Sequence, residues 1–147
     1  MTARFLYLEN AGSPTRWKLD RYFRYLQDVR PTLPVDLRDM TAQDRYELPS
    51  MSPRSMWHAS VTQIEARAKE LFVAARNDGA SRRFEFSYSG VCKVQSTLQR
   101  VRAMPSIVVQ ELVRLPNGIY RHSFSYLGGD VSTIYACSIR FVDRPLQ

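Results

Sequence analysis

The chain has 147 residues, 44% of them hydrophobic and 24% charged, with a formal net charge of +7 at pH 7. This composition excludes wholesale disorder, and the length predicts a single domain, 1–147, with one core. No apolar run approaches the roughly 20 residues that cross a membrane, and residues 5–8 (FLYL) are too few for a signal-peptide core, so we expect a cytoplasmic protein.

The N-terminal third predicts a short strand and then a helix. Residues 4–8 (RFLYL) suit a strand, which Asn10-Ala11-Gly12 ends. Ser13 and Pro14 favour a helix start, and Pro31 places its end near Val29. Its expected buried stripe, at helical spacing, is Leu19, Tyr22, Phe23, Leu26 and Val29.

Residues 31–60 contain four of the eight prolines and more acidic than basic side chains. We expect an irregular, proline-rich excursion across the surface or a mobile loop, with one short helical turn after Thr41. The alternative is a separator between two half-domains.

Residues 61–77 predict a second amphipathic helix. Thr62 and Glu65 form a capping box, and Glu65 and Lys69 are a favourable i,i+4 pair. Asn77-Asp78-Gly79 suits the C-terminal cap. The expected buried stripe is Ile64, Ala68, Leu71, Phe72 and Ala75.

Strict alternation predicts a strand over residues 82–89, with Phe84, Phe86 and Tyr88 facing inward. Gly90 suits a turn or a bulge. Residues 91–104 fit a strand at their start and a helix at their end. Two cysteines, Cys92 and Cys137, match no metal-ligand spacing and are expected as buried reduced thiols, with a single disulfide as the alternative.

The C-terminal third predicts an antiparallel meander. Strands 106–115 and 119–127 flank Asn117-Gly118, the strongest short hairpin signal, and Gly128-Gly129-Asp130 leads into strand 131–142. The second strand sets Tyr120, His122, Phe124 and Tyr126 on its buried face, and its other face is expected to meet water. The third strand sets alternate residues on one face: Val131, Thr133, Tyr135, Cys137, Ile139 and Phe141.

Together these elements predict an α+β fold. A mainly antiparallel sheet of four to six strands, ending in the meander, should carry two amphipathic helices on one face. The aromatic face of the meander should be the floor beneath those helices, and the alternative is an exposed platform that stacks bases.

The basic side chains are almost all arginine: the 21 Lys and Arg include only three lysines. Arginine binds phosphate and carboxylate in bidentate fashion, so a polyanionic partner is indicated. A genome that favours arginine codons would explain the Arg:Lys ratio but not the net charge.

Two basic clusters are the candidate polyanion sites. Lys18, Arg21 and Arg24 would share one helix face, with Tyr25 for stacking; an ordinary solvated helix face is the alternative. The second cluster comprises Arg82, Arg83, Lys93, Arg100 and Arg102. Its alternative role is to protect a strand edge from aggregation.

Other chemistry has little support. His58 and His122 could form a metal-independent ribonuclease pair, but they have no diagnostic spacing. No metal, phosphate-loop or nucleophile motif is present, so we expect no cofactor, no metal and no enzyme activity. Met51, Met56 and Trp57 could form an adaptable interaction surface; their alternative role is a lid over the core.

Three hypotheses follow. The first is a non-enzymatic basic protein that binds nucleic acid, RNA or DNA, electrostatically. The second is a self-assembling structural or adaptor protein, for example of the viral matrix type, that contacts anionic membrane, nucleocapsid or an acidic protein through its strand edges and its proline-rich segment. The third is a small ribonuclease.

Overall fold

The structure is a computed structural model that describes residues 5–13, 16–96 and 105–146. Its helical elements are α1 (Asp20–Val29), η1 (Arg30–Thr32), α2 (Val35–Met40) and η2 (Gln43–Tyr46), where η marks a 3-10 turn. Its strands are β1 (Glu9–Ser13), β2 (Arg16–Lys18), β3 (Ser60–Arg67), β4 (Glu70–Arg76), β5 (Arg82–Ser96), β6 (Ile107–Arg114), β7 (Tyr120–Tyr126) and β8 (Val131–Pro145).

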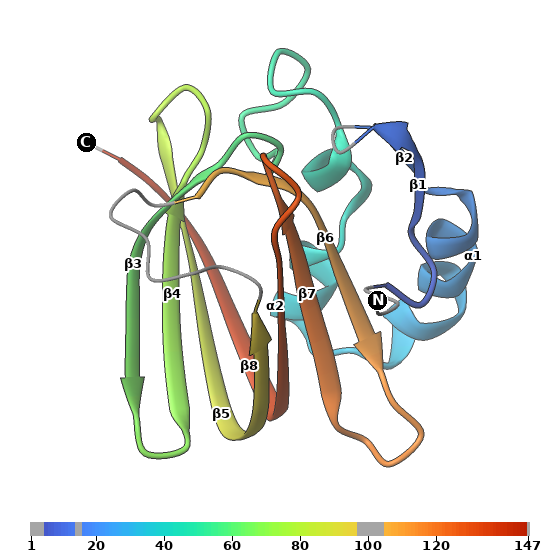
Figure 1. The fold of residues 1–147 in the computed structure, drawn as a ribbon, viewed down its shortest axis with the longest axis vertical. Helices are drawn as coiled ribbons and strands as arrows, with labels where there is room; N and C mark the ends of the chain where they lie inside the picture. The colour runs from blue at the N-terminus through green and yellow to red at the C-terminus, as the bar shows by residue number, and fades with distance from the viewer. Residues whose placement is uncertain (1–4, 14–15, 97–104, 147) are drawn as a thin grey trace.

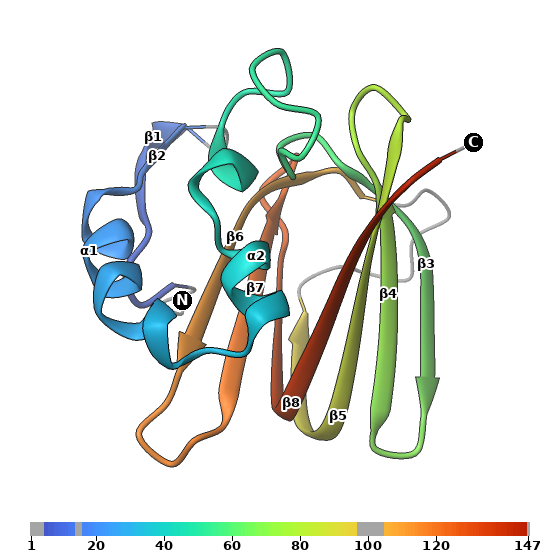
Figure 2. The ribbon, with the colours of Figure 1, turned by 180° about the vertical axis from the view of Figure 1, so that it is seen from behind.

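Six antiparallel strands form one curved sheet in the order β3-β4-β5-β8-β7-β6 (Figure 1). The first and last strands of this order meet at one end, where Ser60 bridges Ser106 and the Ile107 amide donates to the Ala59 carbonyl at 2.7 Å. The sheet therefore curls into a half-closed barrel. The α1 helix and the β1–β2 hairpin lie beyond β6, and α2 lies behind the sheet in Figure 1 and in front of it in Figure 2.

The predicted α+β class and the meander are confirmed. β6, β7 and β8 pair in sequence, with a bulge between Ile107 and Val109. Tyr120, His122, Phe124 and Tyr126 are buried as expected, so their face is no open platform. The expectation that the other face meets water was wrong, because every residue of β7 is buried.

The strand predicted at 82–89 is also confirmed, and it continues to Ser96 in β5. Gly90 has φ +63, and a Cβ there would meet the Cys137 Cβ at 2.8 Å. At this close approach, the set of alternate residues that faces the core changes in both strands. In β8, Ile134 before it and Ile139 after it both lie in the main core, although they would point to opposite faces of an uninterrupted strand. The single buried face predicted for residues 131–142 was therefore wrong. The helix expected at the end of 91–104 falls outside the described residues.

The helix predicted over residues 61–77 was wrong, because this stretch forms the β3–β4 hairpin. Ala68, with φ +48, lies in the turn instead of on a helix face. The Thr62 hydroxyl donates across the ladder to the Ala74 carbonyl at 3.3 Å, so it caps no helix. Burial of Val73 and Ala75 against β5 decided the outcome, because apolar residues in a short segment fit either period.

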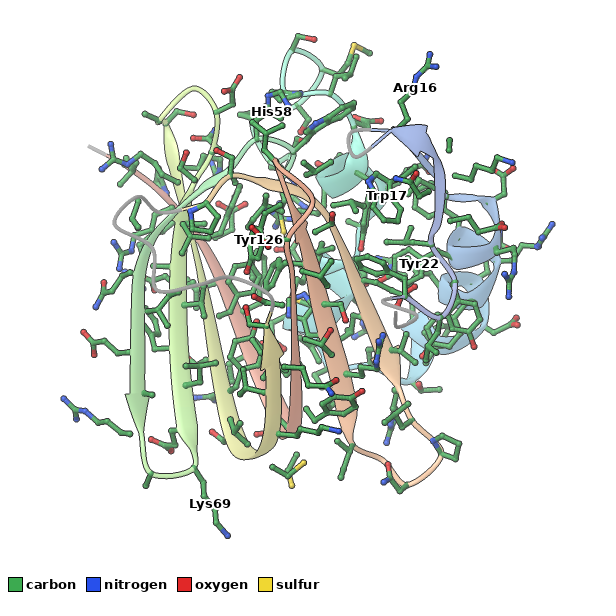
Figure 3. All side chains as sticks on the ribbon, viewed as in Figure 1. Arg16, Trp17, Tyr22, His58, Lys69 and Tyr126 are labelled. Atoms are coloured by element: carbon green, nitrogen blue, oxygen red, sulfur yellow. The ribbon has the colours of Figure 1, made fainter. Side chains whose placement is uncertain are left out.

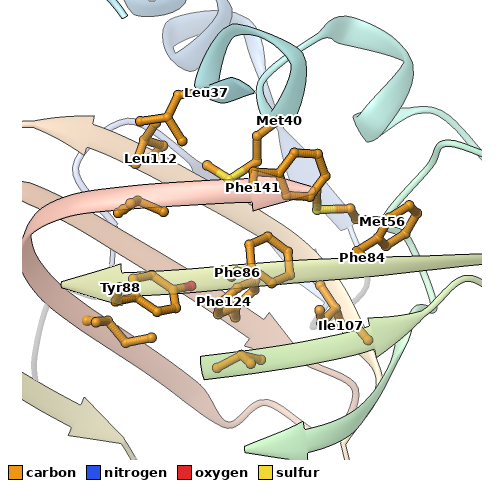
Figure 4. Packing of buried hydrophobic residues seen from close by; sticks show 14 of the residues in the cluster. Leu37, Met40, Met56, Phe84, Phe86, Tyr88, Ile107, Leu112, Phe124 and Phe141 are labelled. Carbon is orange, nitrogen blue, oxygen red and sulfur yellow. The ribbon is translucent and has the colours of Figure 1, made fainter. Parts of the chain in front are cut away.

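The excursion predicted over residues 31–60 was wrong as a surface or mobile segment, because it packs on the inner face of the sheet. Leu37 and Met40 of α2 belong to the main core with Met56 and Phe141, and Met40 lies near Phe141 (Figure 4). The Asp36 carboxylate accepts from the Phe141 amide at 2.7 Å, beyond the point where β8 pairs with β7. The short helical turn expected after Thr41 is present as η2.

The N-terminal strand and the long first helix were also predicted wrongly. The Glu111 carboxylate accepts from three consecutive amides, those of Leu6, Tyr7 and Leu8, at 2.7–3.0 Å. Three successive N–H groups aimed at one acceptor are incompatible with a strand, in which they alternate in direction. Residues 16–18 form β2, so the helix begins at Asp20 instead of Pro14.

The α1 helix and the N-terminal segment build a second core on the outer face of β6. Leu8, Tyr22, Leu26, Val108 and Val109 are its buried members. This second core covers the outer face of β6, which explains why the residues from Ile107 to Val113 are all buried. The two cysteines, predicted as buried, are exposed free thiols near the irregularity in β5 and β8.

Candidate polyanion-binding surface

Among the described residues, β2 and the start of α1 carry four exposed basic side chains close together in the sequence. Arg16, Lys18, Arg21 and Arg24 are exposed, and none of their side chains makes an ion pair or a hydrogen bond with any described residue. Asp20 lies among them in the sequence, and Glu9 lies directly opposite Lys18 across the β1–β2 ladder. We call these four residues the β2–α1 basic surface. In Figure 3, Arg16 projects away from the molecule while Trp17 turns inward.

Local structure explains why these side chains point outward. In β2 the exposure alternates, so that Arg16 and Lys18 share the outer face while Trp17 packs edge-on against Phe5. In α1 the buried side chains are Tyr22 and Leu26, four residues apart, which leaves Arg21 and Arg24 on the solvent side.

Two tyrosines fix α1 to the edge of the sheet. The Tyr22 hydroxyl accepts from the Leu112 amide at 2.7 Å and donates to the Leu112 carbonyl at 3.3 Å. The Tyr25 hydroxyl accepts from the Arg114 amide at 2.7 Å. These bonds satisfy backbone groups of β6 that face away from β7, so α1 protects this edge as an additional strand would. Burial, together with the neighbouring Tyr46, raises the pKa of Tyr22 well above its ordinary value, so its hydroxyl stays protonated.

Of the predicted first cluster, Arg21 and Arg24 share the exposed side of α1, but Lys18 lies on β2 and so on no helix face. Tyr25, predicted as a stacking group, is half-buried. Its ring already stacks on Tyr7 with centroids 4.4 Å apart, and its hydroxyl is bound to β6. Arg16 was not predicted, although the alternation of basic and aromatic residues in Arg16-Trp17-Lys18 was a signal for it.

Most paired acidic groups lie elsewhere, around the buried guanidinium of Arg45. Arg45 bonds Asp39 at 2.8 Å and Asp143 at 2.6 Å. Arg54 and Arg82 extend this cluster to the same carboxylates and to Asp44. In the described part of the chain, six arginines pair with five carboxylates. The internal network is thus almost neutral, and the excess positive charge lies on free side chains such as those of the β2–α1 basic surface.

The predicted second cluster is dispersed. Arg82 and Arg83 point to opposite faces of β5: Arg82 binds Asp143 at 2.6 Å on the inner face, and Arg83 binds Glu85 at 2.7 Å on the outer face. Lys93 is exposed, with its ammonium 5.7 Å from the Tyr135 ring centroid. Arg100 and Arg102 lie outside the described residues.

The predicted interaction surface is not one surface. Met56 is buried in the main core, as the lid alternative expected, whereas Met51 is 71% exposed. Trp57 is half-buried and lines a cavity of about 60 Å³ with Trp17, Leu19, Tyr46, Val108 and Val109. Its indole nitrogen is buried and has no hydrogen-bond partner in the described part of the chain.

The two histidines lie in different environments. His58 is exposed, with φ +66. His122 is completely buried, its Nδ1 lies 2.8 Å from the Tyr88 hydroxyl and its Nε2 lies 2.6 Å from Gln110 Oε1. The Gln110 amide donates onward to the Met40 carbonyl at 2.9 Å. Both ring nitrogens of His122 are therefore used within the core, and no accessible histidine pair exists for acid–base chemistry.

His122 should make the stability depend on pH. Burial lowers its pKa to about 3, whereas the unfolded chain has a value of about 6.5. Between these pH values the imidazole is protonated in the unfolded state and neutral in the folded state. The contribution of His122 to the free energy of unfolding is therefore largest above about pH 6.5, and it falls by about 1.4 kcal/mol per pH unit as the pH decreases towards 3. Urea unfolding of the wild type and of His122→Gln between pH 7 and 4.5 measures this slope.

The His122→Gln variant should be less stable at pH 7 but should lack this component of the slope. His58→Gln is the matched control, because it changes an exposed histidine and leaves His122 in place, so the slope that His122 produces should remain. Equal slopes in the wild type and in His122→Gln would contradict the assignment of the slope to the buried imidazole.

No protein-family model and no curated protein sequence matches the chain. Within residues 5–13, 16–96 and 105–146, no helix is long and apolar enough to cross a membrane, and no three His, Cys, Asp or Glu side chains are grouped to hold a metal ion.

Proposed function

We propose that this protein binds nucleic acid, with the β2–α1 basic surface contacting the phosphate backbone. The observation that carries the proposal is that four basic side chains within residues 16–24 are exposed and have no acidic partner among the described residues, in a chain of net charge +7. Basic side chains that are already paired would have to break those pairs to bind phosphate, and these four would not.

The geometry suits phosphate contact better than base recognition. Three of the four side chains are arginines, which bind phosphate in bidentate fashion. The aromatic rings beside them, Trp17, Tyr22 and Tyr25, are turned towards the second core or are already stacked. We therefore propose binding driven by neutralisation of phosphates, with little dependence on base sequence and a steep dependence on salt.

Charge reversal at Arg21 and Arg24 should remove the binding. Both side chains are exposed on α1, so Arg21→Glu/Arg24→Glu should fold normally while its affinity for a labelled 20-nucleotide RNA or DNA at low salt falls by about tenfold or more. The slope of log K against log[salt] should decrease by about 0.7–0.9 for each phosphate that the variant no longer neutralises. Fluorescence anisotropy at several salt concentrations measures both quantities.

The matched control is Arg76→Glu/Arg140→Glu. These arginines are exposed on β4 and β8 and form no ion pair with a described residue, so the variant changes the net charge equally at another place. Equal loss of affinity in both variants would mean that overall charge alone drives binding. Wild-type protein that binds anionic vesicles but neither RNA nor DNA would overturn the nucleic-acid proposal in favour of a membrane surface.

A further inference from the structure

The two edge strands of the six-stranded sheet, β6 and β3, differ in how far their outward-facing backbone groups are hydrogen-bonded. The β6 edge is covered by the Tyr22 and Tyr25 hydroxyls. Among the described residues, the β3 edge is occupied only at its start, where the Val61 amide donates to the Pro105 carbonyl at 2.9 Å. From Thr62 to Ala66, no described residue pairs with β3 on the side away from β4. A run of unpaired backbone N–H and C=O groups is a template for another strand.

The side chains of β3 between Thr62 and Ala66 are suited to contact with the same strand of a second copy of the protein. Ile64 is 49% exposed although it lies opposite the core residue Val73. Glu65 and Arg67 give the strand one charge of each sign, in a chain whose net charge is +7. Because each copy carries a net positive charge, two copies repel each other. At β3 this repulsion is small, because the strand carries one charge of each sign, and the Ile64 side chain offers apolar surface.

We propose that β3 pairs with β3 of a second copy, antiparallel across a two-fold axis at Ile64. In this register Ile64 meets its own counterpart, Gln63 lies opposite Glu65, and Thr62 lies opposite Ala66. A two-fold axis makes each contact occur twice, and residues directly opposite in an antiparallel pair point to the same face. Gln63 and Glu65 already bond within one copy, at 2.5 Å, so this amide and carboxylate can exchange partners across the axis.

Neighbouring registers are disfavoured by the structure. An axis at Glu65 would set two carboxylates directly opposite each other. An axis at Gln63 would require backbone groups of Val61, which already bind Pro105. An axis at Ala66 would extend the pairing into the turn at Ala68, where φ is +48. The Ile64 register uses residues 62–66, which no described residue pairs on the side away from β4.

Five paired residues bury little surface, so this is a weak association that forms at high protein concentration or when a polyanion gathers several copies.

The inference does not rest on the proposed function, because the contact uses β3 and not the β2–α1 basic surface. The experiments below use nuclease-treated protein, so that bridging by nucleic acid cannot imitate pairing.

Disulfide trapping tests both the pairing and its register. The exposed native thiols are first removed by Cys92→Ser and Cys137→Ser. In this background Ile64→Cys should form a disulfide-linked dimer under mild oxidation, because directly opposite residues have Cα atoms about 4.5–5.5 Å apart. Glu65→Cys is the matched control: its two copies would lie on a diagonal beyond the roughly 7 Å limit for a disulfide. Faster linking of Glu65→Cys, or equal linking of both, would overturn the register.

Sedimentation velocity tests the association without a crosslink. The wild type should show a sedimentation coefficient that rises with concentration, and Ile64→Lys, which sets two cations together at the axis, should remain monomeric. Val142→Lys, at an exposed apolar position on β8, which β4 and β5 separate from β3, should behave as the wild type. A wild type that stays monomeric up to about 0.5 mM, well above weak-complex concentrations, would overturn the proposal, as would an unchanged association of Ile64→Lys.

Discussion

Replacing Arg45 with methionine is expected to destabilise the fold by about 3–5 kcal/mol, because the buried Asp143 carboxylate then loses one of its two close arginine partners. Arg45 has no solvent exposure in its side chain, and Asp143 has 3%. The guanidinium also donates to the carbonyls of Asp39 and Arg54, at 3.0 and 3.2 Å. Its central carbon lies 4.7 Å from the Phe141 ring centroid, so the group also fills space in the main core.

The effect should be large because Arg45 connects elements distant in the chain. It joins η2 to the end of β8 through Asp143, and Asp143 in turn binds Arg82 at the start of β5. Denaturant unfolding of Arg45→Met followed by tryptophan fluorescence measures the loss of stability. Trp57 is close in sequence to the network and should report on it.

Arg144→Met is the matched control for Arg45→Met. Arg144 also pairs with a carboxylate, Glu85, at 2.8 Å, but its side chain is 56% exposed. An exposed pair is worth about 0–1 kcal/mol, so this variant should be nearly as stable as the wild type. A destabilisation below about 1 kcal/mol in Arg45→Met would contradict the prediction, and would mean that the desolvation cost of the network cancels its ionic bonds.

Replacing Glu111 with alanine is expected to cost about 3–5 kcal/mol and to release the N-terminal segment, because it removes a buried carboxylate that accepts from three backbone amides and pairs with a guanidinium. Glu111 has no exposure, and it binds the Arg121 guanidinium at 3.3 Å in addition to the amides of residues 6–8. Glu111→Gln retains one acceptor oxygen and should lose less stability than Glu111→Ala.

Hydrogen exchange locates the consequence of the Glu111 substitution. The amides of Leu6, Tyr7 and Leu8 should lose protection in Glu111→Ala, well before the amides of β7 and β8. Glu65→Ala is the control, because Glu65 is exposed and binds no backbone amide among the described residues. Retained protection at residues 6–8 would show that packing of the second core, and not the carboxylate, holds the segment.

The candidate site was only partly predictable. The spacing of Arg21 and Arg24 indicated a common solvent-facing side, and the structure places both on the exposed side of α1. Lys18 was assigned to the same helix because Ser13-Pro14 resembles a helix start. Packing of Trp17 into the second core, across a long separation in sequence, produces a strand there. The sequence around Arg82 did not show that it binds the distant Asp143 inside the structure, whereas the Arg16 side chain has no partner among the described residues.

The sequence by itself determined the strand at 82–89 and the meander. Residues 82–89 and 119–127 alternate with a period of two, and turns that contain glycine separate the strands of the meander. It also determined the net charge and hence the kind of partner to expect. Only the tertiary structure decided residues 61–77, where the same apolar residues fit a helix or a hairpin and burial against β5 selected the hairpin. The tertiary structure likewise decided which charged and polar side chains are buried. Arg45, Glu111 and His122 are ordinary polar residues in the sequence, and they lie in the core because long-range partners satisfy every one of them.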